Sequence, residues 1–179
     1  MTDTLAEHFL EDAAKVFRGL KKLADGAAAQ VSDEEFFRVL DAESNSIALI
    51  MKHVAGNLRS RWTDFLTTDG EKPDRHRDSE FELDGEDRAA VEARWEAGWQ
   101  TLFVTLASLR GVDPLRTVPI RGEPHTVVQA VNRQLAHYGQ HVGQIVFLAK
   151  HLRSAEWKTL SIARGKSEAF NREMDGGRR

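Results

Sequence analysis

Apolar residues recur at helical spacing, three or four positions apart, in four long stretches of the chain. Segments long enough to form a half-buried strand do not show the alternation of apolar and polar residues that such a strand requires. The four predicted helices cover approximately residues 3–23, 45–69, 86–109 and 126–152. The pattern therefore predicts an all-α protein.

Glycine marks where these helices are expected to end, because its backbone readily adopts the left-handed conformation that caps a helix C-terminus. Asp25-Gly26 follows the first stretch, Asp69-Gly70 follows the second and Gly111 follows the third. A short connector helix is expected after Ser32, where the run Ser-Asp-Glu-Glu has the form of a capping box. Residues 117–123 are predicted to form a short extended piece or a turn.

Long helices joined by short connections favour antiparallel neighbours, so we expect a four-helix bundle, either up-and-down or with one crossover. The second and third helices are joined by a long, densely charged loop over residues 67–85, which contains DGEKPDRHRDSEFELDG. A connection of this length inside a compact domain points to a functional role. The expected organisation is one domain over residues 1–174, in which a C-terminal tail follows the fourth helix, and a disordered segment over residues 175–179.

Composition narrows the possible functions. The chain has 179 residues, of which 41% are hydrophobic, and a formal net charge of −3, which fits one ordinary globular domain rather than a disordered chain. Basic residues are spread along every segment, so no nucleic-acid partner is expected. We expect a cytoplasmic protein without a membrane partner, because no signal-like segment opens the chain and its cleanest apolar run, 145–149, is far shorter than a membrane span.

The chain contains no cysteine, so any metal has to be held by histidines and carboxylates. His137 and His141 lie four residues apart in LAHYGQHVGQI, a spacing that puts both rings one helical turn apart on one face. The pair lies beside the apolar stripe of the fourth predicted helix, and His53 lies beside the apolar stripe of the second. Two rings from one helix and one from an opposing helix would place three nitrogens at one centre and leave a position for water, as in catalytic zinc sites.

The same histidines have a plainer interpretation. A pair at this spacing is commonly a polar helix face, and a single flanking histidine is commonly a hydrogen-bonded core residue. The sequence has no HExxH motif and no inward Glu-x-x-His pairs, so a mononuclear site is favoured over other metal sites. His125 and His151 lie too far along the fourth helix to share an ion with the pair. The residues alone leave both interpretations open.

One histidine on the second helix and HxxxH on a later helix form a pattern that resembles the DinB/YfiT-like superfamily of metalloenzymes. The resemblance extends from about Asn45 to Asn171. Over this range the chain is similar to one subfamily that has no assigned activity. The stretches that carry it are KHVAGNLRSRWTDFLTTDGEKPDRHRDSEF, VPIRGEPHTV, NRQLAHYGQHVGQIVFLAK and WKTLSIARGKS. The last stretch departs from the subfamily, which usually has proline where this chain has Ala163.

The resemblance implies a DinB-like four-helix fold and one divalent transition metal ion, zinc or nickel, with His53, His137 and His141 as its ligands. Members of the superfamily include S-transferases and isomerases that use low-molecular-weight thiols. A small thiol and a small-molecule substrate are therefore implied here, and homodimerisation is a further expectation. The identity of the substrate does not follow from the resemblance, and no catalytic residue is identified.

Other polar residues are candidates for the same site. Asn57 lies one turn after His53 and Gln144 three residues after His141, so each is placed either to orient a ligand or to pack between helices. A group of charged residues contains enough cations to hold an anionic substrate group, with solvated ion pairs as the alternative. These residues are Arg75, Arg77, Asp78, Glu80, Arg121, Arg133, Arg164 and Lys166.

Gly56, Gly139 and Gly143 interrupt the two helices that carry the histidines. Glycine inside a helix costs roughly 0.5–1 kcal/mol relative to alanine. The three glycines therefore indicate either tight helix packing or the close approach of a side chain or ligand.

Two functions follow from the sequence. The first is a metal-dependent enzyme, either a transferase acting with a small thiol or a hydrolase. The second is a non-catalytic, dimeric helical protein for binding or stress response, with a structural metal or none. The reaction type is weakly defined, because the sequence shows no serine nucleophile elbow, no phosphate-binding glycine loop and no carboxylate clearly placed near the histidines.

Overall fold

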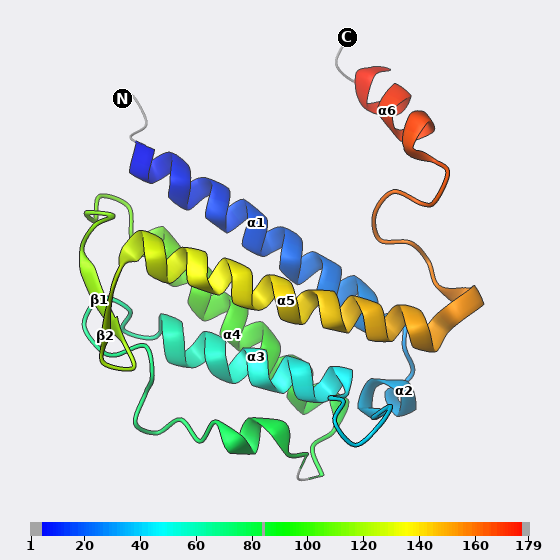
Figure 1. Ribbon diagram of the computed structural model, residues 1–179, viewed down its shortest axis with the longest axis horizontal. Coiled ribbons are helices and arrows are strands. Elements are labelled where there is room, and N and C mark those ends of the chain that lie inside the picture. The colour runs from blue at the N-terminus through cyan, green and yellow to red at the C-terminus, as the bar shows by residue number, and fades with distance from the viewer. Residues whose placement is uncertain (1–4, 84, 177–179) are drawn as a thin grey trace.

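The computed structural model describes residues 5–83 and 85–176, which are mostly helical (Figure 1). The long helices are α1 (Leu5–Ala28), α3 (Ile47–Trp62), α4 (Arg88–Ser108) and α5 (Val127–Arg153). The shorter elements are α2 (Asp33–Phe37), the 3-10 helices η1 (Asp78–Phe81) and η2 (Ser154–Glu156), the strands β1 (Thr117–Ile120) and β2 (Glu123–Thr126), and α6 (Ser167–Gly176). The predicted helical character is confirmed, and a small β-hairpin is added to it.

The four long helices pack as neighbouring pairs, α3 with α4 and α1 with α5 (Figure 1). Lys52, near the start of α3, pairs with Glu86 just before α4 at 3.1 Å. At the other end, the Thr105 hydroxyl of α4 donates to the carbonyl of Trp62 at 2.8 Å. These contacts make α3 and α4 parallel, so the connection over residues 63–87 is a crossover that returns along the length of the pair. These two helices are therefore not antiparallel neighbours, and their connection follows the crossover alternative rather than the up-and-down one.

One aromatic residue from each long helix lies at the centre of the core. Phe17, Trp62, Trp99 and Tyr138 are buried, and the ring centroids of their contacting pairs lie between 5.7 and 6.3 Å apart. Such tilted and edge-to-face contacts add about 0.5–1.5 kcal/mol each beyond area burial. Trp62 Nε1 donates to Tyr138 Oη, which donates to Asn57 Oδ1, at 3.1 and 3.0 Å. Burial raises the pKa of Tyr138 far above its ordinary value, so this hydroxyl stays a neutral donor inside the core.

Two of the predicted helix ends are wrong. Helix α1 continues through Asp25-Gly26 to Ala28, because the Asp25 carboxylate accepts from Trp95 Nε1 at 2.8 Å and Gly26 lies against Leu160. Helix α3 ends at Trp62, well before Asp69-Gly70, and the chain turns away immediately afterwards. The residues expected to cap these helices therefore make tertiary contacts instead.

Asp69-Gly70 holds the β-hairpin. Arg121 and Gly122 form its two-residue turn, and both have positive φ angles, 56° and 75°. Arginine seldom adopts this conformation, and the Asp69 carboxylate stabilises it by accepting both backbone N–H groups of the turn, at 2.8 and 2.7 Å. Gly70 N donates to Pro119 O at 2.9 Å. The crossover loop thereby fixes the hairpin beside the start of α5.

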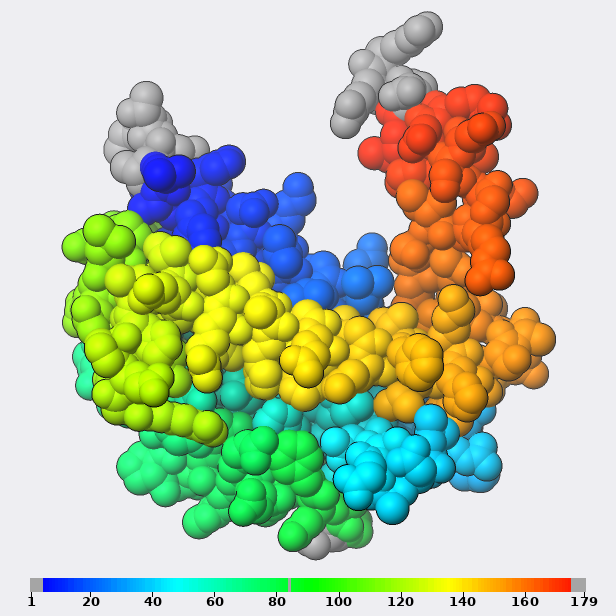
Figure 2. All heavy atoms as spheres, viewed as in Figure 1, coloured from blue at the N-terminus to red at the C-terminus, as the bar shows by residue number. Residues whose placement is uncertain are grey.

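The chain leaves the four long helices after Leu160 (Figures 1 and 2). The side chains of residues 161–174 are exposed, and α6 stands apart from the helical body. Helix α6 extends to Gly176, so it includes the first two residues of the segment expected to be disordered, and residues 177–179 lie outside the described part of the chain. None of the described helices combines the length and the apolar character needed to cross a membrane.

Candidate metal centre

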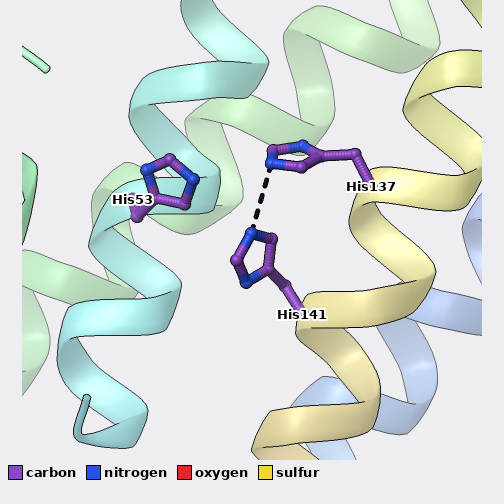
Figure 3. A group of neighbouring side chains, drawn as sticks. All are labelled: His53, His137 and His141. Carbon is purple, nitrogen blue, oxygen red and sulfur yellow. Dashed lines mark hydrogen bonds between the residues drawn. The ribbon is translucent and has the colours of Figure 1, made fainter. Parts of the chain in front are cut away.

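His53 of α3 and His137 and His141 of α5 converge between the two helices (Figure 3). Each ring offers one nitrogen, and these atoms all lie within 4.8 Å of one another. The Nε2 atoms of His137 and His141 are 3.2 Å apart. His53 is buried and the other two rings are half-buried. The structure thus brings together the three histidines that the sequence singles out, in a group that could bind a metal ion.

Helix geometry explains this arrangement. His137 and His141 are one turn apart on α5, so their side chains leave the same face of the helix. Helix α3 packs against that face in the opposite direction. The buried hydrogen bond between Tyr138 and Asn57 sets the register of the two helices, and Asn57 lies one turn from His53. The core contact and the histidine group therefore position each other.

Two of the three rings are oriented by a hydrogen-bond acceptor. His53 Nδ1 lies 2.8 Å from Glu80 Oε2, and His141 Nδ1 lies 2.8 Å from Gln144 Oε1. Because carboxylate and amide oxygens accept, both Nδ1 atoms carry a proton, which leaves Nε2 as the nitrogen that can bind a metal. This is the tautomer that an outer acceptor fixes in metal-binding histidines.

His137 has no comparable partner. Its Nδ1 is buried without a hydrogen bond among the described residues, and its Nε2 faces that of His141. Burial, with smaller contributions from His141 and His53, lowers the pKa of His137 to about 3, and burial also lowers the pKa of His141. Both rings are therefore neutral at neutral pH. In the neutral pair the Nε2–H tautomer of His137 donates to the Nε2 lone pair of His141, and a metal cation bound by both rings would take the place of that proton.

Glu80 corrects the expectation that no carboxylate lies near the histidines. It belongs to η1 in the crossover loop, and its side chain is buried against His53. The Arg75 guanidinium donates to both of its oxygens, each at 2.8 Å. Burial alone would raise the pKa of Glu80, but the hydrogen bonds from His53 and Arg75 outweigh it and lower that pKa. Glu80 is therefore a charged acceptor that holds the His53 ring.

Gly56 makes room for this carboxylate. A Cβ atom at position 56 would lie 2.2 Å from Glu80 Oε1, a distance that no real contact allows. Gly56 is thus explained by the close approach of a side chain and not by helix packing. At Gly139 and Gly143 a Cβ would meet nothing within 4 Å among the described residues, so neither tight helix packing nor a close side chain explains them.

A cavity of about 380 Å³ opens beside the histidines. His53, His137 and Asn57 lie in its wall. This volume is that of a small-molecule site. Five arginines line the same cavity, and none of its lining residues is acidic; the arginines are Arg61, Arg75, Arg77, Arg121 and Arg133.

The candidate residues chosen from the sequence fall into two groups. Most of them lie at the cavity or the histidines: Asn57, Arg75, Arg77, Arg121 and Arg133 line the cavity, and Gln144 contacts His141. Arg164 and Lys166 instead lie in the exposed segment between η2 and α6, and neither lines the cavity. Buried Arg61 and Gln134 also line it, and they were missed because each looks like an ordinary polar residue of its helix.

Fold and site together define a mostly helical protein with a group of three histidines that could hold a metal ion. The family model described as "Protein of unknown function (DUF1572)" matches residues 4–166. The chain therefore belongs to the DUF1572 family, and the match includes all four long helices and the three histidines. No curated protein and no solved structure matches the chain. Its function has to be argued from the site.

The contact between Gly56 and Glu80 can be tested by adding one methyl group. Gly56→Ala should lower stability, because the Cβ displaces the Glu80 carboxylate from His53. Gly139→Ala is the matched control within a helix, and it should stabilise the protein by roughly 0.5–1 kcal/mol, since its Cβ meets open space. Urea unfolding measures both. A gain in stability for Gly56→Ala equal to that of the control would contradict the contact.

Proposed function

We propose that the protein is a divalent-metal-dependent enzyme with one ion bound by His53, His137 and His141. The observation that supports the proposal is the convergence of three imidazole rings beside an open cavity. Structural zinc sites are closed by four protein ligands, whereas catalytic sites keep a position for water or substrate. Among the described residues no fourth histidine or carboxylate joins the group. A bound ion would therefore keep a position open to the cavity.

The surrounding residues hold the rings in place for this role. Glu80 and Gln144 keep Nδ1 protonated on two rings, which leaves Nε2 free to bind the ion. Phe81 stacks on the His53 ring with centroids 4.7 Å apart and covers one of its faces. Arg75 keeps Glu80 charged and fixed. These contacts restrict ring rotation before any ion binds.

The reaction we propose is transfer of a small thiol to an electrophilic substrate, or hydrolysis. A bound zinc or nickel ion would lower the pKa of a thiol or a water molecule and stabilise the anion that forms from it. The chain has no cysteine, so the thiol would arrive as a co-substrate. A position open to the cavity favours this function over the alternative, a non-catalytic dimeric protein with a structural metal or none.

We also propose that the four long helices form the four-helix bundle of the DinB/YfiT-like superfamily. One histidine on α3 and a pair spaced four residues apart on α5 support this assignment. A cytoplasmic location and homodimerisation stay predictions from the sequence.

The metal site is tested by counting ions per chain. Untagged protein should contain one divalent transition metal ion per chain by mass spectrometry, either as purified or after reconstitution with zinc or nickel. His137→Ala and His53→Ala should lose it, because each removes one of three ligands. His151→Ala is the control, since His151 is an exposed residue of the same helix. Circular dichroism shows that the variants stay helical. Stoichiometric metal in folded His137→Ala would contradict the site.

The role of Glu80 is tested by removing its charge. Glu80→Gln should weaken zinc binding about 10–100-fold, the range found when an outer partner of a metal-binding histidine is lost. Glu82→Gln makes the same charge change at an exposed position of the same loop and should leave the affinity unchanged. Competition with a zinc-binding dye measures both dissociation constants. Equal affinity for the two variants would show that Glu80 does not act on the metal centre.

A further inference from the structure

The cavity beside the histidines has an excess of positive charge. Glu71 is shared by three of the lining arginines, at 3.0 Å from Arg61, 3.2 Å from Arg75 and 3.1 Å from Arg121. Glu80 pairs with Arg75 as well. Glu71 thus pairs with three of the lining arginines and Glu80 with one of these, and both carboxylates lie outside the cavity lining.

The other two lining arginines have no buried carboxylate partner. Arg133 has no hydrogen-bond or ion-pair partner for its guanidinium among the described residues. The nearest carboxylate to Arg77 belongs to Asp78, which is 3.9 Å away and fully exposed. Exposed pairs of this kind contribute little. Arg77 and Arg133 are exposed residues, and they line the cavity without a buried carboxylate to neutralise them.

Gln134 is a second, independent sign of a ligand at this place. It lines the cavity next to Arg133, it is 3% exposed, and its Oε1 has no hydrogen-bond partner among the described residues. Buried polar atoms without partners are rare in folded proteins. The amide can rotate to present either its oxygen or its NH₂ group to a bound molecule.

We propose that the substrate carries a carboxylate or phosphate group that is bound by Arg133 and Gln134, with Arg77 at the cavity mouth. This inference rests on the proposed function, since the ion at the histidines would hold the reacting end of the same molecule. A guanidinium group matches carboxylate and phosphate with two parallel hydrogen bonds. Arg133 lies four residues before His137, about one helical turn of 5.4 Å along α5. Arg133, Gln134 and His137 line one cavity of about 380 Å³, a volume that indicates a small substrate.

The test compares anions with an uncharged molecule of the same shape. Calorimetric titration of the zinc-loaded protein should show binding of succinate or inorganic phosphate and none of succinamide. Arg133→Gln should weaken anion binding at least tenfold. Arg172→Gln removes the same charge from an exposed position on α6 and should bind as the unchanged protein does. Metal-free His137→Ala protein should keep part of the anion affinity, because Arg133 is still present.

The outcomes separate this inference from the metal site. Equal anion affinity in the Arg133→Gln and Arg172→Gln variants would overturn the anion site. Anion binding that requires zinc and is unchanged in Arg133→Gln would overturn it as well. A protein that binds no zinc but binds succinate through Arg133 would support the anion site and contradict the proposed metal enzyme. One zinc ion per chain without any anion binding would overturn the anion site and leave the metal centre standing.

Discussion

The Glu80 carboxylate, bound by His53 on one side and Arg75 on the other, is the contact on which the site depends. It joins the crossover loop to α3 through buried charged groups. Removing such groups from water is costly, and only good geometry with satisfied hydrogen bonds compensates for it. Here both carboxylate oxygens are satisfied, and Gly56 provides the space that they occupy. The same contact that fixes the loop also fixes the tautomer of a candidate metal ligand, which links folding of the loop directly to the chemistry of the site.

A second carboxylate, Glu71, holds three of the arginines that line the cavity. It contacts arginines from α3, from the loop and from the hairpin turn, while neighbouring Asp69 holds the unusual backbone of Arg121. The end of α3, the crossover loop and the hairpin turn are thereby joined by two acidic residues, Asp69 and Glu71. The result is a wall of guanidinium groups that stays in place although like charges repel. Two histidines and five arginines line the cavity, a set of side chains suited to a small anion.

Much of the helical framework follows from the sequence, because Phe17, Trp62 and Trp99 lie on apolar stripes of helical period. The histidine group also follows, since the spacing of His137 and His141 is a local property of one helix. The parallel packing of α3 and α4 and the position of Glu80 depend on the path of residues 63–87, which have no hydrophobic period. That path is set by ion pairs between distant residues, which a single sequence does not reveal. Gly56 was the one local sign of such a contact, and its partner could not be identified from the sequence alone.

X-ray absorption at the metal edge of the zinc-loaded protein tests the central claim most directly, because it reports the ligands of the ion itself. The account predicts three imidazole nitrogens at about 2.0–2.1 Å and one or more light-atom ligands from solvent, which are replaced or displaced when succinate or a small thiol is added. A spectrum without the imidazole pattern would contradict the three-histidine site. A spectrum with four imidazole or carboxylate ligands that no added molecule changes would show a closed, structural ion and contradict the proposed enzyme.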